Sequence, residues 1–265
     1  MKKIVSIVLA LVLAAVLLPA AFAESGDMLA RIQERGELII ATEGTWAPWT
    51  YHDDDDVLVG FDIEVATKIA EKLGVKATFV ECLWDSIFAG IDSGRYDIAA
   101  NGVEVTEERS EKYDFSDPYA YIRTALIVRG DNEDITCFED LNGKTTANTL
   151  SSTYAQLGES YGATTTGVDD LDQTIELVLY GRVDATLNAE VSFADYMNVH
   201  PEADLKVVQL SEDASLVSIP VPKGDNESFI AAINQAIAEL SESGELSAIS
   251  EKYFGRDLTK ATVEE

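Results

Sequence analysis

Apolar positions along this chain alternate between two spacings, which predicts alternating strands and helices. Leu38 to Thr42 is a short apolar run that fits a buried strand. Five apolar residues then recur at spacings of three and four and predict a helix that stops at Gly74: Val65, Ala66, Ile69, Ala70 and Leu73. Val75, Ala77 and Phe79 recur at every second position, which predicts a strand with these residues on one face.

The same order of elements follows once more. Asp85 is placed to cap a helix that carries Ile87, Phe88 and Ile91 and stops at Gly94. A strand over Tyr96 to Ala100 comes next. Because helices and strands alternate, we expect an α/β fold whose mixed, mainly parallel sheets are flanked by helices.

Two lobes are expected from the length and from a short internal echo. The chain has 265 residues, more than one compact core usually holds. Ser93 to Ala99 reads SGRYDIA, and Tyr180 to Thr186 reads YGRVDAT. Each copy combines a glycine helix stop, a polar turn and entry into a strand, so chance convergence on that chemistry stays open as an alternative to two similarly built halves.

Two extended segments, Tyr121 to Arg129 and Leu216 to Lys223, predict crossovers between the lobes. A middle lobe inserted into a first lobe would form a two-strand hinge. The predicted boundaries are residues 24–128 for the first part of lobe 1, 129–216 for lobe 2 and 217–265 for the return to lobe 1.

Residues 1–23 have the pattern of an export signal. Lys2 and Lys3 precede an apolar run from Ile4 to Leu18, and Ala21-Phe22-Ala23 is a small-residue cleavage site. A membrane anchor is the alternative, but Pro19 breaks the apolar run. We therefore expect cleavage near Ala23 and a periplasmic or secreted protein.

Charge and cysteine content narrow the function classes further. The formal net charge of −29 disfavours nucleic acid and anionic membranes as partners. Cys82 and Cys137 fall in different predicted lobes, so we expect two buried free thiols, although a bridge between them remains open. No metal-ligand cluster or cofactor motif is found, and the acidic run 53–56 lacks the glycine and glutamate of a calcium loop.

Arg109 is the first candidate binding residue. A guanidinium holds a carboxylate through two parallel hydrogen bonds, which a lysine cannot copy. Thr106 can cap the turn that carries Arg109, and Asn101 and Gly102 end the preceding strand, where a ligand could approach the backbone. The alternative is a surface arginine paired with a neighbouring glutamate, Glu107 or Glu111.

Several ordered motifs resemble one known family. They are Gly60-Phe61-Asp62, Trp84-Asp85, residues 92–97, Gly102 through Arg109, residues 113–119, residues 140–144 and Lys252 to Gly255. Together they look like the periplasmic amino-acid-binding proteins of polar amino acid ABC importers, the family 3 solute-binding proteins. The resemblance implies a type II periplasmic-binding-protein fold that closes on a polar amino acid without transforming it. It also implies a monomer that presents the amino acid to an ABC permease and its ATPase.

Carried over by position, the resemblance assigns several ligand contacts. Arg109 matches the arginine that binds the ligand α-carboxylate. Ser152 and Thr153 match a pair at a helix start in the second lobe, where backbone N–H groups also favour a carboxylate. The remaining matches are two enclosing aromatics and an acidic wall position: Trp46, Trp84 and Glu43.

Two positions depart from the family pattern. The aspartate that usually meets the ligand ammonium is replaced here by Ala189. Glu104 stands where a small hydroxyl residue is common, so we hypothesise that Glu104 takes over the ammonium contact. Glu190 is the competing candidate, because a shift of one residue would restore it, and Glu104 could instead serve a cationic side chain.

The sequence leaves open which amino acid binds and whether the protein only binds its ligand or also converts it. The segments 149–154 and 183–188 look most like the cystine-type branch of the family, while acidic ligands are disfavoured by the pocket carboxylates. An enzyme of the cyclohexadienyl or arogenate dehydratase type on the same fold is the alternative function, with Glu104 or Glu190 as general acid.

Overall fold

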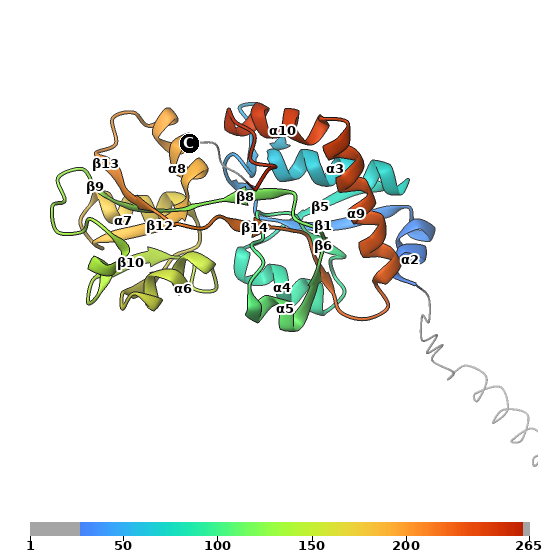
Figure 1. The fold of residues 1–265 in the computed structure, drawn as a ribbon, viewed down its shortest axis with the longest axis horizontal. Coiled ribbons are helices and arrows are strands. Elements are labelled where there is room, and N and C mark those ends of the chain that lie inside the picture. The colour runs from blue at the N-terminus through green and yellow to red at the C-terminus, as the bar shows by residue number, and fades with distance from the viewer. Residues whose placement is uncertain (1–26, 262–265) are drawn as a thin grey trace, which may run out of the picture.

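The computed structural model describes residues 27–261, which form two lobes side by side (Figure 1). The predicted export signal lies outside the described residues. Within 27–261, no helix combines the length and apolar character needed to cross a bilayer.

Lobe 1 is built on a parallel three-stranded sheet of order β5-β1-β6 and a small antiparallel sheet of order β2-β3-β4. Its strands are β1 (Glu37–Thr42), β2 (Thr45–Trp46), β3 (Thr50–His52), β4 (Leu58–Val59), β5 (Lys76–Glu81) and β6 (Ile98–Ala99). Its helices are α2 (Met28–Arg35), α3 (Phe61–Leu73), α4 (Trp84–Asp92), α5 (Glu107–Lys112), α9 (Glu227–Glu242) and α10 (Glu245–Phe254).

Lobe 2 is built on a five-stranded mixed sheet of order β11-β10-β12-β9-β13. The strands are β9 (Thr124–Arg129), β10 (Thr145–Asn148), β11 (Thr164–Gly167), β12 (Ala185–Ala189) and β13 (Leu205–Leu210). The helices are η1 (Phe138–Leu141), α6 (Thr153–Ser160), α7 (Leu171–Leu179) and α8 (Glu190–Val199). Strands β10, β11 and β12 are parallel, and β9 is antiparallel to both of its neighbours.

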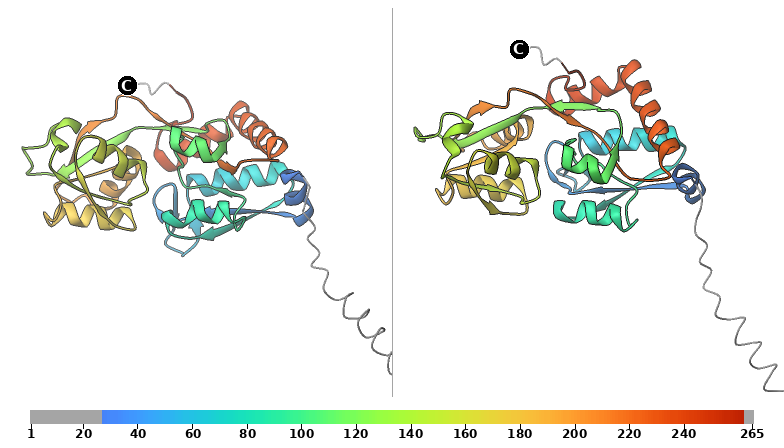
Figure 2. Two further views of the ribbon diagram at one scale, coloured as in Figure 1. Left: turned by 90° about the horizontal axis from the view of Figure 1, so that it is seen from below. Right: turned by 60° about the horizontal axis from the view of Figure 1, so that its bottom comes forward.

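Two extended segments of the chain join the lobes, and they run side by side in both views of Figure 2. They contain β8 (Ala120–Ile122) paired with β14 (Ser215–Val217), and β7 (Tyr113–Phe115) paired with β15 (Pro220–Pro222). The sheet of lobe 2 begins with β9 at Thr124, a few residues before the boundary at 129 that the sequence suggested, because β9 follows β8 almost without interruption.

Helix α3 shows how the sequence pattern becomes structure. Its apolar residues are buried, and Gly74 ends it in the left-handed conformation with φ 76°, which costs glycine little. Helix α4 differs from the prediction at its start. Leu83 is the N-cap residue and Asp85 lies in the first turn, so the Asp85 carboxylate is not the cap.

The internal echo corresponds to equivalent turns in the two lobes. Gly94 and Gly181 both have positive φ, at 69° and 62°. Asp97 accepts a hydrogen bond from the Ile39 backbone N–H at 2.7 Å, and Asp184 accepts one from the Thr145 backbone N–H at 2.7 Å. In each lobe, therefore, an aspartate ties the turn to the neighbouring strand.

The two cysteines lie in different lobes, as the sequence predicted, and both are free. They are partly exposed rather than buried. Burial raises the pKa of the Cys82 thiol.

Candidate ligand-binding site

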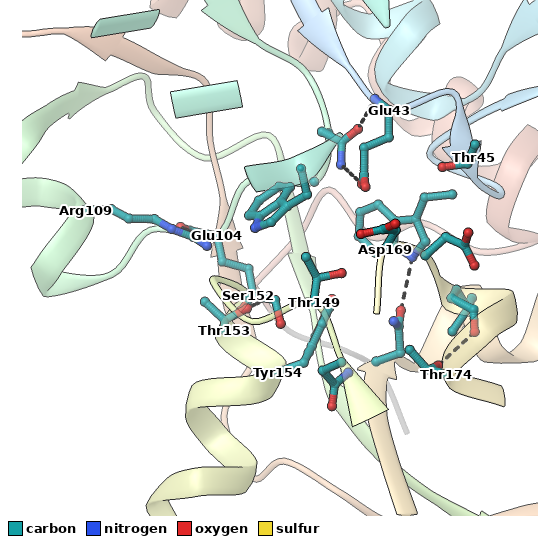
Figure 3. Close-up of a pocket in the computed structure, with 18 residues that line it drawn as sticks. Glu43, Thr45, Glu104, Arg109, Thr149, Ser152, Thr153, Tyr154, Asp169 and Thr174 are labelled. Carbon is teal, nitrogen blue, oxygen red and sulfur yellow. Dashed lines mark hydrogen bonds between the residues drawn. The ribbon is translucent and has the colours of Figure 1, made fainter. Parts of the chain in front are cut away.

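A cavity lies between the lobes, with about 570 Å³ of empty space when the open solvent at its mouth is included (Figure 3). Nine of the ten residues predicted from the sequence line it: Glu43, Trp46, Trp84, Asn101, Gly102, Glu104, Arg109, Ser152 and Thr153. The tenth, Glu190, does not. Residues far apart in the chain therefore converge on one cavity.

Arg109 is buried in the wall of this cavity, with 9% of its surface exposed. Thr106 caps α5 by accepting a hydrogen bond from the Arg109 backbone N–H at 3.1 Å. The guanidinium carbon lies 5.1 Å from the centre of the Trp84 ring, and Nη1 donates to the Glu104 carbonyl at 2.9 Å. This burial excludes the alternative of a surface arginine.

The second guanidinium nitrogen of Arg109, Nη2, is buried and has no hydrogen-bond partner in the described part of the chain. Burial lowers the pKa of Arg109, and the charge of Glu104 opposes that shift. A buried, unpaired cationic donor is costly unless a ligand supplies an acceptor.

The start of helix α6 faces the cavity from lobe 2. Ser152 is its N-cap and accepts a hydrogen bond from the Ala155 backbone N–H at 3.1 Å. The first N–H groups of a helix lack partners within the helix and carry partial positive charge. Arg109 and the α6 start therefore give this part of the cavity two kinds of carboxylate-binding group.

Glu104 connects the lobes at this end of the cavity. Thr153 Oγ1 donates to Glu104 Oε1 at 2.7 Å, and only 5% of the Glu104 surface is exposed. An isolated bridge with Val217 fixes the backbone of Glu104. A carboxylate thus lies close to the carboxylate-binding groups, and its charge acts on Arg109.

Trp46 forms a flat wall that also reaches across the cleft. Its Nε1 donates to Asn188 Oδ1 of lobe 2 at 3.1 Å, and its ring stacks on Trp49 with 5.4 Å between centroids. Gly102 has φ +57°, and a Cβ there would lie 2.5 Å from Trp46 Cζ3. Only glycine fits between that backbone and the ring without a displacement.

Glu43 lies on the other side of the cavity from Arg109 (Figure 3). Asn101 orients it twice, since Asn101 Nδ2 donates to Glu43 Oε2 at 2.6 Å and Asn101 Oδ1 accepts from the Glu43 backbone N–H at 2.8 Å. Burial raises the pKa of Glu43 to about 7, the hydrogen bond from Asn101 opposes the shift, and the charges of Asp170 and Asp85 add to it.

The competing candidate Glu190 does not line this cavity. It is the first residue of α8 and forms an ion pair with Arg256, in a separate groove that contains Phe254 and Gly255. Ala189, the position before it, is fully buried and has no polar side chain. A shift of one residue therefore does not restore an acidic group to the cavity.

The sequence missed several residues that line the cavity from lobe 2, besides Thr45 of lobe 1. They are Asn148, Thr149, Tyr154, Asp169, Asp170, Leu171, Thr174 and Asn188. Most of them lie at or just after the carboxyl ends of the parallel strands β10, β11 and β12, where ligands bind in open α/β sheets. That rule was the available signal, but it requires the strand order, which the sequence pattern did not supply.

Comparison with known proteins now adds to this geometry. A model of the bacterial extracellular solute-binding proteins, family 3, matches residues 38–256. The chain belongs to this family. The L-cystine-binding protein TcyA of Bacillus subtilis is 40% identical to it over 239 residues, which make up 90% of this chain and 88% of the relative.

Two solved structures bear on the fold and on the lobe arrangement. An ancestral arginine-binding protein bound to arginine is 35% identical, with a TM-score of 0.78 over 83% of this chain and 99% of the other. The L-cystine solute receptor of Neisseria gonorrhoeae in its unliganded open conformation is 38% identical, with a TM-score of 0.60 over 89% and 100%. The predicted type II periplasmic-binding-protein fold is confirmed.

The lobe arrangement matches the ligand-bound protein better than the open one, although the identities are similar. Hydrogen bonds between the lobes agree with a closed cleft: Trp46 to Asn188, Thr153 to Glu104, and Ser151 to Asp85. We conclude that the cavity has the shape it takes when the lobes are together.

One further structural relative concerns catalysis. The ancestral amino acid-binding protein AncCDT-1, a precursor of cyclohexadienyl dehydratase, is 29% identical with a TM-score of 0.78, over 85% of this chain and 99% of the other. The family and the curated relative above are nevertheless binding proteins.

Proposed function

We propose that this chain is the extracytoplasmic substrate-binding subunit of an ABC importer, which binds one polar amino acid between its lobes and delivers it to the membrane permease. The main observation behind this proposal is that Arg109 lines a cavity between the two lobes and that its buried Nη2 has no hydrogen-bond partner within residues 27–261. The family and the relatives support the same function.

The α-carboxylate of the ligand would bind Arg109 and the start of α6. Arg109 Nη1 already donates to the Glu104 backbone carbonyl, so Nη2 is the donor for which a ligand carboxylate would supply the acceptor. The guanidinium lies over the Trp84 ring, so little side-chain freedom would be lost on binding.

The α-ammonium would bind Glu104, in place of the aspartate that this chain lacks at Ala189. Thr153 donates to only one carboxylate oxygen, so the second remains an acceptor for the ligand. Because that hydrogen bond spans the lobes, the ammonium contact and the closed cleft would support each other.

A thermal-shift screen against the twenty amino acids, cystine and ornithine, followed by calorimetry, tests this function. Binding to the folded state alone raises the melting temperature. We expect at least one polar amino acid to bind and Arg109→Met to abolish its binding. Failure of every amino acid to bind would overturn the proposal.

Delivery requires an ABC permease and its ATPase as partners, with the chain acting as a monomer. Proteoliposomes that carry the cognate permease complex should import the identified amino acid only when this protein is added. Light scattering with and without ligand should give the monomer mass. Ligand binding without stimulated import would support the ligand-binding role and contradict the role in an ABC importer.

A dehydratase activity is the second candidate, favoured by one observation. Glu43, with a pKa raised to about 7, is partly protonated at neutral pH and could donate a proton in the cavity, whereas Glu190 lies outside it. Incubation with prephenate or arogenate and detection of the aromatic product by absorbance tests it. We expect no turnover, because Arg109 and Glu104 are placed to bind the two charges of a zwitterion.

A further inference from the structure

The cavity carries more negative charge than a zwitterionic ligand needs. Four carboxylates line it, Glu43, Glu104, Asp169 and Asp170, and Arg109 is the only cation among its described lining residues. The ligand's two α-charges would match Arg109 and Glu104. Three carboxylates then remain without a counter-charge.

These remaining acids lie away from Arg109. In Figure 3, Arg109, Glu104 and Thr153 occupy one side of the cavity, and Glu43 and Asp169 the other. Glu43 comes from lobe 1 and the two aspartates from lobe 2. All three line the same cavity, and the charge of Asp170 raises the pKa of Glu43 further.

A buried acceptor points to a ligand at the same place. Asn148 is 1% exposed, and its Nδ2 donates to the Leu187 carbonyl at 2.7 Å. Asn148 lines the cavity, and its buried Oδ1 has no hydrogen-bond partner in residues 27–261. The Val168 backbone N–H donates to the Asn148 backbone carbonyl at 3.3 Å, so the end of β10 lies beside the segment that carries Asp169.

The two aspartates differ in what already holds them. Asp170 caps α7, because its oxygens accept from Gln173 N at 2.9 Å and Gln173 Nε2 at 2.6 Å. The Asp169 carboxylate has no hydrogen-bond partner within the described chain and is exposed to the cavity mouth. Asp169 therefore offers a free carboxylate, and Asp170 adds a fixed charge behind it.

We infer that Asp169, Asp170 and Asn148 of lobe 2 form, with Glu43 of lobe 1, a second pole of the cavity that binds a cationic group at the far end of the ligand. This inference rests on the proposed function and narrows it. The ligand is an amino acid of net positive charge, with an amine or guanidinium on its side chain.

Charge also separates this ligand class from cystine. The far half of cystine carries a carboxylate as well as an ammonium, and the described lining residues offer no second cation for that carboxylate. Repulsion between it and the three acids would oppose binding. A side-chain amine or guanidinium meets them without such a conflict and can donate to Asn148 Oδ1.

The same pole ties ligand choice to closure. Without a ligand, Glu43 on one lobe and Asp170 on the other repel each other as the cleft closes. A cation between them removes the repulsion and attracts both lobes. A neutral side chain of similar shape would fill the space but leave the repulsion in place.

Calorimetry with L-arginine and L-citrulline tests the inference, because citrulline replaces the guanidinium with a neutral group of similar shape. L-lysine, L-ornithine, L-glutamine and L-cystine complete the set. We expect a cationic amino acid to bind tightest, and arginine to bind at least about tenfold more tightly than citrulline. Cystine or glutamine binding tightest would overturn the inference and leave the proposed function standing.

Variants locate the effect. Asp169→Asn should lower the affinity for arginine about tenfold and reduce its advantage over citrulline. Glu176→Gln, an exposed carboxylate on α7 outside the cavity, is the matched control and should change neither. An equal loss of affinity for arginine and citrulline in Asp169→Asn would contradict the inference that Asp169 helps to bind a cationic group. If no amino acid bound the unaltered protein, the proposed function itself would fail.

Discussion

Thr153 of lobe 2 donates a hydrogen bond to Glu104 of lobe 1, with 2.7 Å between Oγ1 and Oε1. The two residues are far apart in the chain and meet only where the lobes come together. Glu104 is thus placed both to bind a ligand and to form a hydrogen bond between the lobes when the cleft closes.

Glu104→Gln should weaken amino-acid binding about tenfold to a hundredfold, since hydrogen bonds to a charged group contribute roughly 1.5–3 kcal/mol. The amide can still accept from Thr153, so closure geometry is retained. Calorimetry measures the effect, with Glu107→Gln on the exposed face of α5 as control.

Glu190→Gln should change the affinity by less than about threefold, because the Glu190–Arg256 pair lies outside the cavity and Arg256 is partly exposed. The opposite pattern, a large loss in Glu190→Gln and none in Glu104→Gln, would show that the ammonium contact is assigned to the wrong residue.

Arg109→Met should reduce the affinity more than about a hundredfold, while the melting temperature of the ligand-free protein stays level or rises. The variant removes a buried, incompletely paired charge, whose desolvation is costly. Differential scanning calorimetry and titration report the two effects separately. Arg109→Lys should not restore binding; full affinity in that variant would argue against a two-pronged carboxylate contact.

Gly102→Ala should destabilise the protein by about 1–3 kcal/mol and weaken ligand binding. The new Cβ would require a positive φ and would meet the Trp46 ring at 2.5 Å. Denaturant unfolding measures the stability, and tryptophan fluorescence reports the ring's displacement. Gly143→Ala shares a positive φ but has no atom within 4 Å of the added Cβ, so it isolates the cost of the backbone conformation.

Asp62→Asn should flatten the pH dependence of stability. Asp62 is buried, accepts hydrogen bonds from the Gly102 N–H and the Tyr119 hydroxyl, and has its pKa raised by burial from 3.8 to about 7. Between those values the native state holds more protons than the unfolded state, so stability falls as pH rises from about 4 to about 7.

The measurement is the melting temperature of both proteins from pH 4 to 8. Other carboxyl groups contribute to each curve, so the difference between the curves isolates Asp62. A difference that does not change across this range would mean that Asp62 titrates normally in the folded protein.

Local chemistry explains what could be predicted from the sequence. The Thr106 cap of the Arg109 turn and the Ser152 cap of α6 depend on residues within three positions of each other. The helix stop at Gly74 is equally local. Such signals are complete within one short window, and the structure confirms them.

Features that depend on tertiary arrangement escaped prediction. Asn148, Asp169 and Asp170 meet Glu43 only because parallel strands of one lobe end opposite the other lobe. Glu190 was retained as a candidate because one residue along a chain decides which way a side chain points, and here it points to Arg256. The boundary expected at residue 129 falls at the end of β9, because β8 and β9 follow each other with almost no break in the sequence pattern.

The matching aspartate-tied turns of the two lobes have a practical consequence. Asp97 anchors its turn to β1 and Asp184 anchors its turn to β10, so each carboxylate serves one half of the molecule only. Loosening either one separately makes one lobe less rigid while the other keeps its own anchor. Hydrogen exchange and ligand binding can then be measured on each variant. The two variants would reveal which lobe must be ordered before the amino acid binds, and which lobe can become ordered as it binds.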